Sequence, residues 1–232
     1  MPWVVYIRQA GGWDFCTGSL ISDRYVLTAA HCVPEHGDPF DMAVHMGQEC
    51  GLRRTWSKVQ AIKVTRIIRH ERYMDISGTG NDIALLELEK PKFGTRRDVM
   101  PVCLSNSTSG FDNYMVSGWG LVSDGLNKVS NDCLNEAEID VLDSRDCKRH
   151  GSVFDKTEYV MCGGGETGIC SGDSGAPLMS RRYGRVLQSG IASFGRVDCS
   201  IATKTPSGFE RLAPHINWIK SHATGGSHIC VK

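Results

Sequence analysis

Residues 170–178 read Cys-Ser-Gly-Asp-Ser-Gly-Ala-Pro-Leu and are the most informative stretch of this chain. Ser174 lies in their middle, and Gly172 lets the backbone turn so that its N–H group faces a reacting carbonyl. A serine hydroxyl attacks an acyl carbon when a base removes its proton, a buried acid orients that base and backbone N–H groups stabilise the oxyanion. We therefore expect a histidine and an acid elsewhere in the chain to complete a site with Ser174.

Two earlier segments offer these partners. Residues 27–32 (LTAAHC) contain His31, and residues 81–86 (NDIALL) contain Asp82. In this interpretation Ser174 is the nucleophile, His31 acts as general base and then as general acid, and Asp82 orients the imidazole. The backbone N–H groups of Gly172 and Ser174 are the expected oxyanion donors. The structural alternative for His31 is a core histidine that packs beside a disulfide.

The composition limits the classes of protein to consider. The 232 residues are 41% hydrophobic and 22% charged, which is enough apolar surface for a folded core. The 26 basic and 26 acidic side chains balance, so charge gives no reason to expect nucleic acid or an anionic membrane as the main partner. No apolar run approaches the roughly 18–20 residues that a membrane-spanning helix needs.

Short apolar or alternating segments recur between glycine-rich turns. Their length and their Val, Ile and Tyr content predict strands near 3–7, 20–21, 25–28, 59–64, 83–88, 114–116, 137–141, 176–179 and 186–192. Only residues 144–148 and 214–222 have a helical pattern. This pattern predicts an all-β protein, an antiparallel barrel or sandwich. The stretch 97–113, rich in Ser, Asn, Pro and Gly, would divide it into two similar halves.

At the three motifs the sequence resembles the chymotrypsin-like (trypsin-fold) serine proteases. The order His, Asp, Ser matches, and the likeness extends to residues 101–104 (PVCL), 117–120 (SGWG), 193–195 (SFG) and the C-terminal segment with Trp218. The resemblance implies two packed six-stranded antiparallel β-barrels with a C-terminal helix, about 1–105 and 106–232, within a single peptidase domain. It also implies a serine endopeptidase that works through an acyl-enzyme and needs no cofactor.

The resemblance further implies a substrate pocket. In the family the residue six positions before the nucleophile forms the base of the primary pocket, and here it is Gly168, followed by Ile169. The other pocket residues implied are Ser193, Phe194, Gly195 and Ser207, or Gly208 in place of Ser207. Because Gly168 has no charge to pair with a buried Lys or Arg, we expect an uncharged apolar residue before the scissile bond. Asp198 and Glu210, near the pocket walls, are the acids that could compensate.

The ten cysteines, none in a Cys-x-x-Cys pair, are typical of disulfides formed in an oxidising compartment. We therefore expect a secreted, extracellular or secretory-granule protein, with a glycosylation sequon at Asn106. The resemblance implies the pairs Cys16–Cys32, Cys147–Cys162 and Cys170–Cys199. It also implies that Cys103 ties the domain to a propeptide or light chain. Cys50 with Cys133 is a plausible further bridge, and Cys230 has no partner that the sequence indicates.

No metal site is expected. No two histidines stand at metal-ligand spacing with a carboxylate. Some relatives hold calcium in the loop after the segment that resembles residues 44–47. Gln48 follows Gly47 where those relatives carry a carboxylate, so calcium is not expected here either.

Active relatives begin with a segment freed by proteolysis, whose ammonium pairs with the acid before the nucleophile, here Asp173. Met1 aligns beyond that segment, so about 10 residues are expected to be missing and this chain to be zymogen-like. The alternative function is a catalytically silent homologue that acts as a binding or regulatory module. The expected partners are a peptide or protein substrate and a protein inhibitor.

Overall fold

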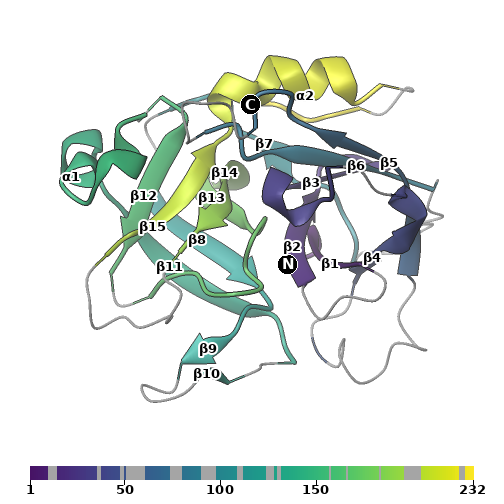
Figure 1. Cartoon of the computed structure of the whole chain (residues 1–232), viewed down its shortest axis with the longest axis horizontal. Coiled ribbons are helices and arrows are strands. Elements are labelled where there is room, and N and C mark those ends of the chain that lie inside the picture. The colour runs from purple at the N-terminus through teal and green to yellow at the C-terminus, as the bar shows by residue number, and fades with distance from the viewer. Residues whose placement is uncertain are drawn as a thin grey trace.

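The computed structural model describes residues 1–9, 15–35, 38–47, 50, 61–73, 80–89, 98–108, 112–123, 128–129, 132–156, 158–165, 167–182, 184–195, 205–224 and 228–232. Two β-barrels lie side by side, with a helix above them (Figure 1). Within the described residues, no helix combines the length and apolarity that a membrane crossing requires.

The first barrel is closed by six antiparallel strands. In spatial order they are β1 (Val4–Gln9), β2 (Phe15–Leu20), β3 (Tyr25–Thr28), β6 (Ala84–Leu88), β5 (Ala61–Arg69) and β4 (Met42–Met46). Alternation of buried and exposed residues is clearest at the start of β5, where Ile62 and Val64 point inward between exposed neighbours. The interior is filled by aliphatic side chains, among them Val5, Leu20, Val26, Val44 and Leu86.

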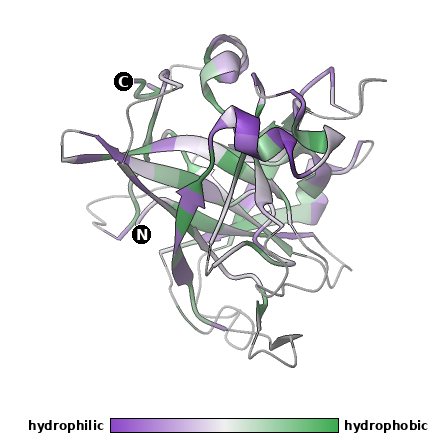
Figure 2. Cartoon of the chain, turned by 90° about the vertical axis from the view of Figure 1, so that its left-hand side faces the viewer, coloured by the Kyte–Doolittle hydropathy of each residue, from purple (hydrophilic) through white to green (hydrophobic). Residues whose placement is uncertain are grey.

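The second barrel has the same number of strands. Its order is β13 (Pro177–Arg182), β8 (Asp112–Gly118), β11 (Asn135–Val141), β12 (Val160–Gly164), β15 (Ser207–Arg211) and β14 (Arg185–Phe194), and pairing of β13 with β14 closes it. Polar and apolar residues mix along the same strands, as expected when one face is buried (Figure 2). The predicted fold class, two six-stranded antiparallel barrels with a C-terminal helix, is confirmed.

Smaller elements complete the fold. A short strand, β7 (Cys103–Leu104), runs parallel to β14, and β9 (Val122–Ser123) pairs with β10 (Lys128–Val129). The α-helices are α1 (Ser144–Lys148) and α2 (Ile216–His222), and the 3-10 turns are η1 (Ala30–Cys32), η2 (Pro39–Asp41), η3 (Ser152–Phe154) and η5 (Ala213–His215).

The two helices lie where the sequence predicts them. Asp143 caps α1 by accepting hydrogen bonds from the N–H groups of Arg145 and Asp146. The second helix begins at Ile216, two residues later than expected, because Pro214 lies in the 3-10 turn η5. Its residues Ile216 and Ile219 pack in one buried cluster with side chains of the first barrel, including Ile21, Tyr25, Leu27, Ile83 and Leu85. The C-terminal helix is therefore part of the core.

Four disulfides lie within the described residues. Cys16–Cys32 and Cys147–Cys162 join the pairs that the resemblance implies, and Cys50–Cys133 is the further bridge that the sequence suggested. The fourth is Cys103–Cys230. Cys170 is also disulfide-bonded, and its predicted partner Cys199 lies outside the described residues.

The Cys103–Cys230 bond corrects an expectation. Cys103 was predicted to tether an upstream propeptide or light chain, and that prediction is wrong because its sulfur is bonded within the chain. The reason is the path of the C-terminus. Leu104 N–H donates to the Cys230 carbonyl at 2.8 Å, and Lys232 N–H donates to the Leu104 carbonyl at 2.9 Å. This pairing brings the two cysteines together.

Removing this bridge tests the assignment. The double variant Cys103→Ser/Cys230→Ser should lose about 2–5 kcal/mol of unfolding free energy, because the bridge closes a long loop of the unfolded chain. Urea unfolding measures the loss. Non-reducing peptide mapping of the unaltered protein should find the two cysteines in one cross-linked fragment. A Cys103 peptide that is free or bonded to another chain would contradict the structure.

Candidate active site

Strand pairing brings His31 and Asp82 together. β3 and β6 are antiparallel, with Thr28 opposite Ala84, so the residues just after β3 lie beside those just before β6. His31 lies in the 3-10 turn η1 that follows β3, and Asp82 precedes β6. The His31 Nδ1 atom is 2.7 Å from Asp82 Oδ2, and the backbone N–H of His31 donates to Asp82 Oδ1 at 3.0 Å.

The Asp82 carboxylate also receives a donor from the second barrel. Ser193, in β14, donates its hydroxyl to Asp82 Oδ2 at 2.5 Å. The Asp82 side chain is 8% exposed, whereas that of His31 is 31% exposed. Three donors therefore fix a buried carboxylate, which holds the imidazole with Nδ1–H toward Asp82. The other ring nitrogen, Nε2, is left as the atom that can exchange a proton with a substrate-side group.

Ser174 lies in the turn before β13, and two backbone hydrogen bonds place that turn. The Ser174 carbonyl accepts from Thr17 N–H at 2.8 Å, and Gly175 N–H donates to the carbonyl of Ala192 at 2.8 Å. Ala192 precedes Ser193, the donor to Asp82. The turn is thus held next to both the first barrel and the residue that contacts the carboxylate.

Close packing confirms how near this turn is to the His31 segment. Gly175 has a φ of +83°, and a Cβ atom there would lie 2.1 Å from Thr28 Oγ1 and 2.2 Å from the Thr17 carbonyl oxygen. Only glycine fits this position. Among the described residues Ser174 Oγ makes no hydrogen bond to His31. Such contacts are often long before substrate binds and shorten in the complex.

Gly172 has the backbone conformation that the sequence led us to expect. Its φ is +98°, and a Cβ atom would lie 2.5 Å from the Phe15 ring. Within the described part of the chain, neither Gly172 N–H nor Ser174 N–H donates a hydrogen bond.

Asp173, between these two donors, points into the second barrel. Its carboxylate accepts from the N–H of Gly120 at 2.8 Å and from the N–H of Cys170 at 3.0 Å. A Cβ at Gly118 or at Gly120 would collide with it, at 2.2 and 2.3 Å. Burial raises the pKa of Asp173 to about 6, although the two N–H groups act in the opposite direction. No cation contacts this carboxylate among the described residues.

The residues expected at the substrate pocket come together in part. Ile169 is buried, and its N–H donates to Ser207 Oγ at 3.3 Å. A Cβ at Gly195 would lie 2.9 Å from Ile169, and one at Gly168 would lie 3.4 Å from Ser207 Oγ. These four residues therefore adjoin one another, and none of them is charged.

The other two expected pocket residues direct their side chains elsewhere. The Ser193 hydroxyl donates its hydrogen bond to Asp82 Oδ2, as described above. The Phe194 ring packs against Gly208, where an added Cβ atom would lie only 2.1 Å from the nearest ring atom. The centroid of the Phe194 ring is 5.5 Å from the centroid of the Phe154 ring. Phe194 thus packs in the hydrophobic cluster around Cys147 and Cys162.

Glu210 does not supply a charge to the pocket. Its Oε1 atom accepts from the N–H of Asn81 at 2.8 Å and is 2.6 Å from His215 Nε2. Both side chains of this pair are almost completely buried, at 1% and 3% exposed. Of the two acids that the sequence left open as compensating charges, Glu210 has its carboxylate directed at Asn81 and His215, in the segment before Asp82 and in η5. Asp198 lies outside the described residues.

Sequence reasoning missed Thr17 and His215. Thr17 contacts the Ser174 turn across 155 residues of sequence, and no local pattern marks such a contact. His215 follows Glu210 by five residues across η5, a spacing that matches neither a strand nor a helix period. Asn106, the predicted glycosylation site, is exposed.

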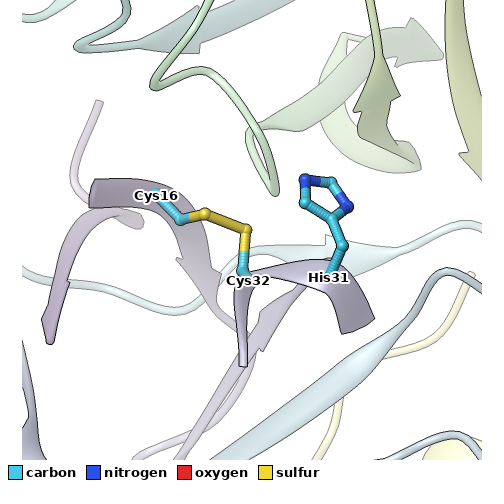
Figure 3. Close-up of side chains that lie close together, drawn as sticks. All are labelled: Cys16, His31 and Cys32. Atoms are coloured by element: carbon cyan, nitrogen blue, oxygen red, sulfur yellow. A yellow bond between two sulfur atoms is a disulfide. The ribbon is translucent and has the colours of Figure 1, made fainter. Parts of the chain in front are cut away.

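Cys16, His31 and Cys32 lie close enough for their ligand atoms to surround an ion (Figure 3). However, the two sulfurs form a disulfide with each other. Metal ligation by cysteine uses a thiolate, so this cluster does not suit a metal. The bridge instead fixes η1, which carries His31, to β2.

Comparison with known proteins agrees with this geometry. The family model described as Trypsin matches residues 1–219. Phenoloxidase-activating factor 3 of Holotrichia diomphalia is 34% identical over 250 aligned residues, which cover 95% of this chain and 68% of that protein. Because the family match takes in the segments that carry His31, Asp82 and Ser174, the chain belongs to the trypsin family of serine proteases.

Proposed function

We propose that the chain is a serine endopeptidase with His31, Asp82 and Ser174 as its catalytic residues. The observation that carries this proposal is the hydrogen-bonded His31–Asp82 pair, with the Ser174 turn packed against the strand that leads into His31. Carboxylate, imidazole and hydroxyl are the groups that nucleophilic acyl transfer needs. The described residues supply them from both barrels.

The proposed reaction has two halves. Ser174 Oγ attacks the carbonyl carbon of a peptide bond while His31 Nε2 takes the hydroxyl proton. The N–H groups of Gly172 and Ser174 stabilise the negative oxygen of the tetrahedral intermediate. His31 then gives the proton to the leaving amine, and an acyl-enzyme remains. In the second half a water molecule attacks the ester carbonyl while His31 takes its proton, and His31 then returns the proton to Ser174 Oγ as the carboxylic acid product leaves. Asp82 holds the imidazole ring in both halves.

The pocket supports a preference for uncharged apolar P1 residues. Gly168, Ile169, Gly195 and Ser207 adjoin one another without a charged side chain, and Glu210 is bound to His215 and Asn81. A cationic P1 group would lose its hydration there without gaining an ion pair from these residues, which is costly.

We further propose that the protein is secreted, is made as a zymogen, and acts on a protein or peptide substrate. Disulfide bonding supports an oxidising compartment. The relative's name, which refers to activation of phenoloxidase, supports a protein target. A buried Asp173 carboxylate without a cation supports regulation by a new ammonium group, since such a charge would gain from an ionic partner.

The same carboxylate favours a second candidate, a homologue without proteolytic activity that acts as a binding or regulatory module. If no ammonium group ever pairs with Asp173, no ion pair holds the turn that carries the oxyanion donors Gly172 and Ser174. Reactivity of Ser174 distinguishes the two functions.

Labelling of Ser174 tests the main proposal. A fluorophosphonate probe should modify the activated protein at Ser174, because phosphonylation needs the nucleophile and the oxyanion donors. Ser174→Ala should abolish labelling and lower kcat by about 10⁴-fold or more. Ser221→Ala, an exposed serine on α2, is the control and should label normally. An activated protein that neither labels nor cleaves peptides would favour the binding module.

A panel of peptide substrates tests the P1 preference. Substrates with Leu, Met or Phe before the scissile bond should have kcat/KM values at least tenfold above those with Arg, as expected from the cost of an unpaired buried cation. Gly168→Asp should reverse the order by supplying a carboxylate. Faster cleavage after Arg by the unaltered protein would refute the assignment.

The pH dependence of stability tests the state of Asp173. The pKa of Asp173 in the folded state, about 6, lies above the ordinary value of 3.8, so the folded state holds this proton more tightly than the unfolded state does. The contribution of protonated Asp173 to the free energy of unfolding is fully present below about pH 4 and is lost as the pH rises through about 6. Urea unfolding should show this loss in the unaltered chain and not in Asp173→Asn. Identical pH profiles for the two proteins would contradict the assignment.

A further inference from the structure

Thr17 connects the two barrels at the Ser174 turn. It lies in β2, is fully buried, and makes three hydrogen bonds to other segments. Its N–H donates to the Ser174 carbonyl at 2.8 Å, and its hydroxyl donates to the Gly172 carbonyl at 3.0 Å. Its own carbonyl accepts from the Thr28 hydroxyl at 2.9 Å.

These bonds hold both sides of Asp173. The Gly172 and Ser174 carbonyls lie on either side of Asp173, and a single residue of the first barrel binds both, the former through its hydroxyl and the latter through its backbone N–H. Thr28, the third partner, ends β3, the strand that leads into His31. Thr17 therefore lies between the segment of the proposed base and the segment of the proposed nucleophile.

The packing around Thr17 leaves little freedom. A Cβ at Gly175 would lie 2.2 Å from its carbonyl oxygen, and one at Gly118 would lie 3.3 Å from its hydroxyl. Gly172, by contrast, has no side chain, so its own backbone offers no resistance to rotation of the adjoining peptides. Two hydrogen bonds fix the peptide between Gly172 and Asp173: its N–H donates to the Cys170 carbonyl at 2.9 Å, and its carbonyl accepts from the Thr17 hydroxyl. The Thr17 bond is the one that comes from the first barrel.

We propose that Thr17 is a positioning residue for the oxyanion donors of the reaction proposed above. Oxyanion stabilisation is effective when the donors already point at the developing charge and need no reorganisation. Thr17 provides this order by anchoring two peptides, the one that contains the Gly172 carbonyl and the one that contains the Ser174 carbonyl. The peptide with Gly172 N–H immediately precedes the first of these, and the peptide with Ser174 N–H lies between the two. Thr17 touches neither the substrate nor the reacting atoms, so its effect is exerted through the turn.

Two substitutions isolate the Thr17 hydroxyl. Thr17→Val keeps the shape of the side chain and removes the donor, whereas Thr17→Ser keeps the donor. In the activated protein Thr17→Val should lower kcat about tenfold with KM changed less than twofold, as expected for one lost hydrogen bond. Thr17→Ser should stay within twofold of the unaltered protein in kcat. Thr28→Val, which removes a similarly buried hydroxyl away from Gly172, is a further control and should retain more activity than Thr17→Val.

A second readout does not depend on turnover. In ¹H–¹⁵N NMR spectra the amide signals of Gly172 and Ser174 should shift or broaden in Thr17→Val and stay in place in Thr17→Ser. If Thr17→Val does not fold, Thr17→Ala and Thr17→Ser replace the pair, because they differ only in the hydroxyl. Equal kcat values and equal amide signals within the pair would overturn the positioning role.

The two proposals fail in different ways. Absence of labelling and turnover in the unaltered activated protein overturns the protease function, and the amide signals then decide the role of Thr17 alone. Normal activity in the unaltered protein with no difference between the Thr17 variants overturns the positioning role and leaves the protease function standing.

Discussion

The candidate site depends on the buried carboxylate of Asp82, because it is the point where donors from both barrels meet. His31 approaches it from the first barrel with two N–H groups, and Ser193 approaches from the second barrel with a hydroxyl. A buried carboxylate without donors would carry a large desolvation penalty, so these contacts are required for its stability as well as for its orientation. The same bonds that satisfy the charge also fix the imidazole and connect the barrels.

Asp173 presents the opposite case within the same site. Its two partners are backbone N–H groups, which offset only part of the cost of burial, and its pKa rises accordingly. The neighbouring glycines at 118 and 120 make room for the carboxylate and leave no space for a larger residue. The turn that carries Ser174 is therefore built around a group whose charge is poorly compensated in the described residues. Contacts of the backbone add to its order, among them the hydrogen bonds of Thr17 to the Gly172 and Ser174 carbonyls.

Much of the fold and of the site could be predicted from the sequence because the information is local. Alternating segments predict strands, and the segments around His31, Asp82 and Ser174 each contain a recognisable motif. The contacts that could not be predicted join residues far apart in sequence. Cys103 was assigned to another chain because nothing in its own segment shows that the C-terminus returns beside β7. The sequence around Thr17 predicts only a strand residue, because its partners Gly172 and Ser174 lie far along the chain, in the turn before β13.

The Glu210–His215 pair shows how such distant contacts support Asp82. Asn81 has a φ of +62°, an uncommon conformation for a residue with a side chain, and its N–H is held by Glu210 Oε1. This strained residue immediately precedes Asp82, so the bond stabilises the backbone that presents the carboxylate to His31.

Aromatic rings cover this pair from the side of β5 and α2. The His70 ring lies 5.3 Å from that of His215 and 4.9 Å from that of Trp218. Burial, with a smaller effect of the nearby His215, lowers the pKa of His70 to about 4. His70 is consequently neutral at physiological pH and packs as an uncharged ring. The buried Glu210 carboxylate, which sequence reasoning placed near the substrate pocket, thus holds the backbone before Asp82 in place.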